Sequence, residues 1–347
     1  MSLSPLQIEL LKWQHLDLAP TSLLYRSILN DINVFFFSFS SRFSGLQLRI
    51  KGIARSQMNV GRTRCSSEQQ YFHYIRDLFG KMHGMVMSVE RGEYIYPFEY
   101  ELPSTIAYST EGKYGEIYYG IKIVLDIPYE LSKEIRLPLT VIRYEDLNTM
   151  PLLKCPKHEE TSKTFCWLFI CCLGTSPLVM SVSIPFSGFV PGQKIPITIE
   201  MNNQSHVDVR STKITLKGLH TFNFDYPSTC KQVEKYRLDY KLAKGVKSGK
   251  SVKLEEYLKV PEMLNPSIEA HCKVFQITYI IKVTAAVDDP HQSPFVHIPV
   301  TVGSFPLVFK EPVGLKTTHQ MPQIFDSARK TKTAQTLYNE VIRLNEM

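Results

Sequence analysis

Four short motifs occur twice in this chain, in the same order and at nearly the same separation. A single pair of similar motifs could arise by chance, but four in order indicate two copies of one domain. The separations fall between 158 and 166 residues. The pairs are RIKGIA (49–54) with TLKGLH (215–220), ELP (101–103) with KVP (259–261), IYYGIK (117–122) with ITYIIK (277–282), and LPLTV (137–141) with IPVTV (298–302).

The repeated unit has the pattern of β structure. Short runs alternate between apolar and polar residues and are separated by Gly, Pro, Asn and Asp; examples are 46–50, 117–124, 194–200 and 213–217. Such runs predict half-buried strands, and many short strands with turn signals favour a sandwich. At 347 residues with 44% apolar content, the chain is large enough for two such cores. The best helical candidates are the N-terminal stretch and residues 326–346.

The first copy differs from the second at its start. The second copy opens with GFVPGQKIPITIE at 188–200, a Pro-Gly turn that leads into an alternating strand. The counterpart should lie near residue 26, but residues 22–42 contain neither Pro nor Gly. We therefore expect the first sandwich to lack its opening strands.

No segment has the character of a membrane span or a secretory signal. The most apolar run, 165–173, is too short to cross a bilayer. Residues 1–20 include two acids and no basic stretch before an apolar core. The seven cysteines are odd in number and irregularly spaced, which favours reduced thiols over a disulfide framework. These features predict a cytoplasmic protein.

One cysteine group has enough ligands to be tested as a zinc site. It comprises Cys155, His158, Cys166, Cys171 and Cys172. Adjacent cysteines on a strand point to opposite faces, and the chain contains no Cys-x-x-Cys. We therefore predict buried structural thiols, with no metal and no cofactor.

Three histidines near acids or hydroxyls are the only catalytic candidates. His73, His83 and His220 lie outside every catalytic motif that we considered, including the nucleophile elbow and the zinc-protease helix. The sequence therefore predicts a protein that is not an enzyme.

Positive charge is concentrated between residues 231 and 259, which hold nine Lys or Arg against four acids. Its lysines recur at every third position through Gly245 and Gly249, so we expect a long basic hairpin rather than a helix. This hairpin is a candidate surface for anionic lipid or a partner, and the alternative is a solvated loop. Nucleic acid is not expected, because no aromatic residues interleave with the lysines along one face. The candidate lysines are Lys241, Lys244, Lys247, Lys250 and Lys253.

Residues 92–103 and 111–118, rich in Tyr, Pro and Gly, resemble the N-domain core of the arrestins, and of the α-arrestins most. Residues 165–167, 188–195, 203–205 and 298–303 resemble parts of the arrestin C-domain. The resemblance covers about residues 44–306. The positions that match the family pattern are Pro97, Phe98, Leu102, Pro103, Gly112, Gly115, Tyr118, Gly188, Pro191, Gly192, Asn203 and Gly303.

We expect most of these positions to be structural. Tyr96, Phe98 and Tyr100 should share one strand face, with Pro97 at a strand start or edge. Gly112, Gly115, Gly188 and Gly192 should allow turns with positive φ.

The resemblance implies two tandem immunoglobulin-like β-sandwich domains. The expected divisions are an atypical N-terminal segment at 1–43, an arrestin-like N-domain at 44–155, a linker at 156–175, an arrestin-like C-domain at 176–308 and a tail at 309–347.

The resemblance also implies a cytosolic adaptor that binds the cytosolic tails of membrane proteins together with endosomal trafficking proteins. Such a protein regulates endocytosis, endosomal sorting or ubiquitination of its cargo, at the plasma membrane or endosomes. Many α-arrestins recruit a ubiquitin ligase through Pro-Pro-x-Tyr, but this chain contains no Pro-Pro, so a ligase would need another route. The alternative is a Vps26-like subunit of a sorting coat complex.

Overall fold

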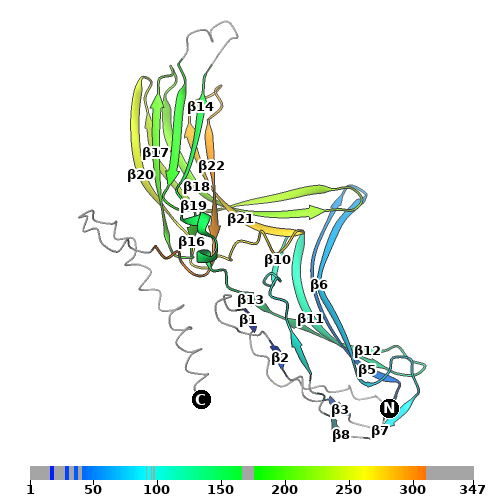
Figure 1. Ribbon diagram of the computed structural model, residues 1–347. Helices are drawn as coiled ribbons and strands as arrows, with labels where there is room; N and C mark the ends of the chain where they lie inside the picture. Colours follow the sequence, from blue (N-terminus) through cyan, green and yellow to red (C-terminus); the bar gives the residue numbers. More distant parts are fainter. Residues whose placement is uncertain are drawn as a thin grey trace. The chain divides into compact units, whose positions relative to one another are not determined.

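Alternating apolar and polar residues form strands throughout the described part of the chain. The computed structural model describes residues 16–18, 28–30, 35–37, 41–90, 92–94, 96, 98–165 and 176–309 (Figure 1). In β21 (Phe275–Ala286) every second side chain is buried, and β15 (Leu178–Ile184) repeats this pattern. Because strand side chains alternate between faces, each strand gives one face to a core. The prediction of a tandem all-β fold is confirmed.

The described residues belong to two compact units. The first unit comprises residues 1–144, 220–234 and 268–277, and the second comprises 145–219, 235–267 and 278–347. Three strands of the second unit therefore have ends that belong to the first: β18 (Val209–Phe224), β19 (Cys230–Val246) and β21.

The main sheet of the first unit has the order β10-β11-β5-β6, and β12 also pairs with β11. Four shorter pairs accompany it, β1 with β13, β2 with β9, β3 with β8 and β4 with β7. The bounds are β1 (Leu16–Leu18), β2 (Ile28–Asn30), β3 (Phe35–Phe37), β4 (Ser41–Phe43), β5 (Gly45–Val60), β6 (Thr63–Gly80), β7 (Met87–Val89), β8 (Gly92–Tyr94), β9 (Glu99–Glu101), β10 (Thr110–Gly112), β11 (Gly115–Asp126), β12 (Lys133–Leu139) and β13 (Val141–Arg143).

Two sheets form the second unit, in the orders β14-β15-β17-β20 and β16-β22-β21-β18-β19. Two short 3₁₀ helices, η1 (Leu147–Thr149) and η2 (Pro151–Lys154), precede them. The remaining bounds are β14 (Lys157–Lys163), β16 (Gly188–Phe189), β17 (Lys194–Asn203), β20 (Lys250–Lys259) and β22 (Phe295–Val302).

The N-terminal segment corrects one expectation. We expected no opening strands in the first sandwich, but β1 to β4 all lie within residues 16–43 and pair with later strands. Each has only three residues, and the sequence at 22–42 has no Pro-Gly turn like the one that opens the second copy. The predicted helix at 326–346 and residues 1–15 lie outside the described residues.

One buried tyrosine occupies the equivalent position in each copy. Tyr119 and Tyr279 are separated by 160 residues, and their exposed fractions are 0% and 1%. The Tyr119 hydroxyl donates to the Ala107 carbonyl over 2.7 Å, and the Tyr279 hydroxyl donates to the Asn265 carbonyl over the same distance. In both cases the acceptor precedes the tyrosine in the chain, so the hydrogen bond ties an incoming loop to a central strand. Burial raises the pKa of Tyr119, which keeps its hydroxyl protonated as a donor.

These hydrogen bonds should contribute to stability separately in each unit. We expect Tyr119→Phe to lower the free energy of unfolding by about 1–3 kcal/mol, because the buried Ala107 carbonyl loses its donor. Tyr279→Phe should lower it by about 0.5–1.5 kcal/mol, because Asn265 is exposed and water can replace the donor. Tyr118→Phe is the matched control: Tyr118 is 38% exposed, so its change should stay within about 0.5 kcal/mol. Urea denaturation followed by circular dichroism measures all three. Losses no larger than that of the control would refute this role.

Candidate functional site

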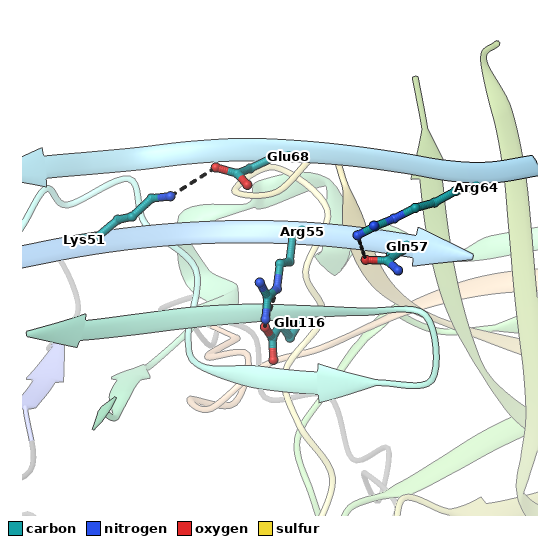
Figure 2. Close-up of polar contacts among 6 residues, drawn as sticks. All are labelled: Lys51, Arg55, Gln57, Arg64, Glu68 and Glu116. Carbon is teal, nitrogen blue, oxygen red and sulfur yellow. Dashed lines mark hydrogen bonds and ion pairs between the residues drawn. The ribbon is translucent and has the colours of Figure 1, made fainter. Parts of the chain in front are cut away.

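Charged side chains on β5, β6 and β11 of the first unit neutralise one another (Figure 2). Lys51 Nζ lies 3.3 Å from Glu68 Oε1, and Arg55 Nη2 lies 2.5 Å from Glu116 Oε1. The strand register explains the arrangement, because Arg55 lies opposite Glu68 on one side and Glu116 on the other. Exposed pairs such as these contribute at most about 1 kcal/mol each to stability. Two further cations of these strands, Arg49 and Arg64, bond instead to the neutral side chains of Gln47 and Gln57.

The outer face of β18, β19, β21 and β22 in the second unit has a different character. Strand alternation places four cations there without an ion pair to any residue that the structure describes. Three of these cations line a shallow depression together with two tyrosines and a threonine. We call this surface the basic face; it comprises Lys217, Lys235, Arg237, Lys282 and His297.

Burial, and after it the positive charge of neighbouring lysines, lowers two pKa values on the basic face. Burial lowers the pKa of Lys282, and the charges of Lys217 and Lys235 lower it further. Burial also lowers the pKa of His297, with the three lysines adding to the effect. Lys282 Nζ lies 4.0 Å from the centre of the Phe295 ring, a cation–π contact that offsets part of the repulsion. An anion bound here would relieve that repulsion.

The five lysines predicted as a lipid or partner surface differ in their surroundings. Lys241 Nζ lies 2.5 Å from Glu256 Oε2, and Lys253 Nζ lies 3.0 Å from Glu200 Oε1. The other three are exposed and form no ion pair with a described residue; they are Lys244 on β19, Lys247 in the following turn and Lys250 at the start of β20.

The basic segment is not the hairpin that we predicted. β19 belongs to the five-stranded sheet, whereas β20 pairs with β17 in the other sheet. A tight turn at 247–250, with Gly249 at φ +70°, passes the chain from one sheet to the other. Because strand side chains have a period of two, a spacing of three puts Lys241 and Lys244 on opposite faces of β19. The sequence spacing therefore does not produce one continuous stripe.

The glycines predicted to need positive φ have two different roles. Only Gly192 has it, at φ +83°, in the Pro191-Gly192 turn before β17. The other three are needed for close packing. A Cβ on Gly112 would lie 2.8 Å from the Phe275 ring, and one on Gly115 would lie 2.6 Å from a backbone oxygen. Gly188 similarly faces leucine side chains at 3.2–3.3 Å.

Asn203 is the family-pattern residue with the most extensive polar contacts. It is fully buried, and its amide nitrogen donates to the carbonyls of Val207 (2.8 Å) and Val246 (3.3 Å). Its carbonyl oxygen accepts from the Ser205 hydroxyl over 2.6 Å. This network ties the 203–207 loop to the end of β19.

The other family-pattern positions also lie in structural settings. Phe98 and Leu102 are buried, Pro103 is half-buried, and Tyr118 lies over Gly120. A Cβ on Gly303 would lie 2.6 Å from the Leu147 side chain. Pro97 lies outside the described residues.

The aromatic stretch forms less strand than predicted. Of Tyr96, Phe98 and Tyr100, only Tyr100 lies in a strand, β9, where its ring packs 5.5 Å from Phe72 and 4.9 Å from Tyr74 between centroids. Phe98 still reaches the core, because the irregular chain before β9 turns it inward.

The candidate catalytic and metal-binding residues are dispersed. His73 lies on β6, His83 in the following loop and His220 on β18, where burial lowers its pKa. Cys155 is exposed, contrary to the prediction of a buried thiol, because it follows the short helix η2 at the surface. His158 lies on β14, whereas Cys166, Cys171 and Cys172 lie outside the described residues. No helix of the described ranges is long and apolar enough to cross a membrane.

Sequence reasoning missed the basic face. Two of its members, Lys235 and Arg237, lie in the basic run 231–259, but Lys217 and Lys282 lie outside that run and are separated by 65 positions. The alternation gave a signal for Lys217, which falls on the polar phase of the predicted strand 213–217. Only the strand order, which places β21 beside β18, brings them together.

Comparison with known proteins gives two domain matches. Residues 44–148 match the arrestin (or S-antigen) N-terminal domain, and residues 175–307 match the arrestin (or S-antigen) C-terminal domain. Together these matches cover well over half of the chain.

Three curated relatives extend the comparison. The chain is 34% identical to arrestin domain-containing protein 4 of Mus musculus over 154 residues, which are 44% of this chain and 36% of that protein. It is 25% identical to arrestin domain-containing protein 17 of Caenorhabditis elegans over 281 residues, 75% of this chain and 62% of the other. With arrestin domain-containing protein 1 of Rattus norvegicus it shares 25% identity over 62% of this chain and 47% of that protein. The chain thus spans 36% to 62% of the length of these relatives.

The pKa of His297 should respond to a change of charge on the basic face. Replacing Lys282 with glutamine removes a neighbouring positive charge, so the pKa of His297 should rise toward the usual imidazole value of about 6.5. NMR titration of the ring protons measures it. His220 is the internal control, because burial and Glu234 determine its pKa; a shift of His220 alone would contradict the assignment. In the unsubstituted protein the pKa of His297 is lower in the folded state than in the unfolded state. As the pH falls below about 6.5, His297 is protonated first in the unfolded state, so the free energy of unfolding decreases.

Proposed function

The chain belongs to the arrestin family, and from this membership we propose that it is a non-enzymatic adaptor for membrane-protein cargo. It binds cytosolic segments of membrane proteins and brings trafficking proteins to them, regulating endocytosis, endosomal sorting or ubiquitination. It works in the cytoplasm and peripherally at the plasma membrane or endosomes. A ubiquitin ligase is among the proposed partners.

The observation that supports this proposal is the difference between the two charged faces. In the first unit, Arg55 and Lys51 are paired with acids of neighbouring strands. In the second unit, burial lowers the pKa of His297, and the charges of Lys282, Lys217 and Lys235 lower it further. An acidic or phosphorylated segment of a cargo tail supplies the charge that the basic face lacks. The basic face is therefore the proposed cargo contact.

A binding experiment with cargo-tail peptides tests the cargo contact. We expect the full chain to bind acidic cytosolic-tail peptides of membrane proteins, and Lys217→Glu with Lys282→Glu to weaken binding at least about tenfold. The matched control is Lys157→Glu with Lys163→Glu, which makes the same charge change on β14 of the opposite sheet. Fluorescence anisotropy gives both affinities. Equal losses in the two variants, or no peptide binding by the full chain, would argue against the proposal.

The lysines that lack ion pairs on β19, β20 and their turn support a contact with anionic lipid. Near a membrane surface each lysine contributes about 1 kcal/mol, so Lys244→Ala, Lys247→Ala and Lys250→Ala combined should weaken vesicle binding roughly a hundredfold. The slope of binding against salt concentration should fall as well. Co-sedimentation with phosphatidylserine vesicles measures both quantities.

The control for this lipid contact is Lys241→Ala with Lys253→Ala, because Glu256 and Glu200 already neutralise those charges. The control should lose less affinity per lysine removed. Vesicle binding that is unchanged in the triple variant would exclude this lipid surface.

A further inference from the structure

Two neighbouring loops of the first unit expose four large apolar side chains. The loop 81–86 connects β6 to β7, and the loop 127–132 connects β11 to β12. Tyr129 and Leu131 are 106% and 93% exposed, and Met85 and Val86 are 88% and 49% exposed. We call these four residues the apolar tip. Single exposed apolar residues are common, but a cluster of this kind marks an interaction site.

A buried carboxylate holds the two loops together. Asp126, at the end of β11, accepts a hydrogen bond from the backbone nitrogen of His83 over 2.5 Å. It also accepts from the Ser132 hydroxyl over 3.3 Å, and His83 Nδ1 lies 3.5 Å away. Both loops line one hollow at this end of the unit, which Val86 and Leu131 share. The position of the apolar tip is therefore set by specific contacts of each loop.

The backbone of both loops is in an uncommon conformation. His83 has φ +56° and Tyr129 has φ +62°, in the left-handed region that residues other than glycine seldom adopt. For a bulky residue such as Tyr129 this conformation has an energetic cost, and it persists where surrounding contacts impose it. Here it directs an aromatic side chain fully into solvent, where the side chain contributes nothing to the core.

Lysines flank the apolar tip. Lys81 begins the first loop and Lys133 follows the second, and both are exposed. Neither forms an ion pair with a residue in the described ranges. Glu130 is the exposed acid within the loops, so the two lysines and this glutamate together carry a net charge of +1. The buried Asp126 is occupied by its contacts with His83 and Ser132. Tyrosine together with lysine around an apolar centre is the composition that favours the interface between lipid headgroups and acyl chains.

We propose that the apolar tip inserts into the headgroup region of a negatively charged membrane. The four side chains are exposed on two neighbouring loops, and a fluid lipid surface can accept them without a pocket of complementary shape. Leu131 and Met85 enter the acyl boundary, the Tyr129 ring lies at the interface, and Lys81 and Lys133 contact lipid phosphates. This surface belongs to the first unit, whereas the lysines of β19 and β20 belong to the second.

Vesicle binding tests the insertion directly. Tyr129→Ser with Leu131→Ser should weaken binding of the full chain to mixed phosphatidylcholine and phosphatidylserine vesicles by at least about tenfold at every salt concentration, because apolar burial is lost. Met263→Ser is the matched control, since Met263 is 99% exposed in the second unit. All the substituted residues are exposed, so thermal melting should not change.

The depth of insertion into the bilayer is measured with a second variant, Tyr129→Trp, which keeps an aromatic ring at this position. The fluorescence of Tyr129→Trp should be quenched by brominated lipids more than that of the unsubstituted chain. Insertion is overturned by absent quenching, by unchanged vesicle affinity of the serine variant, or by a chain that does not bind vesicles. It is also overturned if the serine variant keeps vesicle affinity but loses a protein partner in cell lysate, which would assign the apolar tip to protein docking. No cargo is present in these experiments, so their failure would leave the adaptor proposal standing.

Discussion

The hydrogen bond from a buried tyrosine hydroxyl to a backbone carbonyl is the constraint on which each half of this protein depends. Tyr119 and Tyr279 lie in central strands with almost no exposed surface, and each donates to a carbonyl of the loop that precedes its strand. A buried hydroxyl without a hydrogen-bond partner is costly, so each tyrosine favours the arrangement in which its upstream loop supplies the acceptor. The motif that is repeated in the sequence therefore carries the same buried tyrosine and the same type of hydrogen bond in each unit.

The two copies have kept this core and diverged at the surface. In the first unit, Arg55 pairs with Glu116, which lies opposite it in the strand register. In the second unit, Lys217 and Lys282 form no ion pair with a residue that the structure describes, and the charge of Lys217 adds to burial in lowering the pKa of Lys282. Arrestin family membership accounts for the shared scaffold. The differences in charge and exposed apolar surface are what can distinguish the ligands of the two units.

Local patterns were enough to predict the fold. Alternation identified strands such as β11 and β17, and the Pro191-Gly192 turn occurs where the sequence indicated it. Features that depend on neighbours could not be predicted in this way. Gly112 and Gly115 lack a side chain because a ring and a backbone oxygen lie close to them. The strand order that brings Lys282 beside Lys217 has no local signature in the sequence. The lysines spaced by three positions suggested one continuous basic surface, but a strand places such residues on opposite faces.

We propose that the protein is an adaptor for membrane cargo and that surfaces on its two repeated units bind its partners. Proximity labelling in cells with the full chain as bait tests this most directly, because it reports partners without assuming a binding site. Labelled proteins should include transmembrane receptors or transporters together with endosomal sorting proteins. A labelled set that contains no membrane proteins would contradict the proposal.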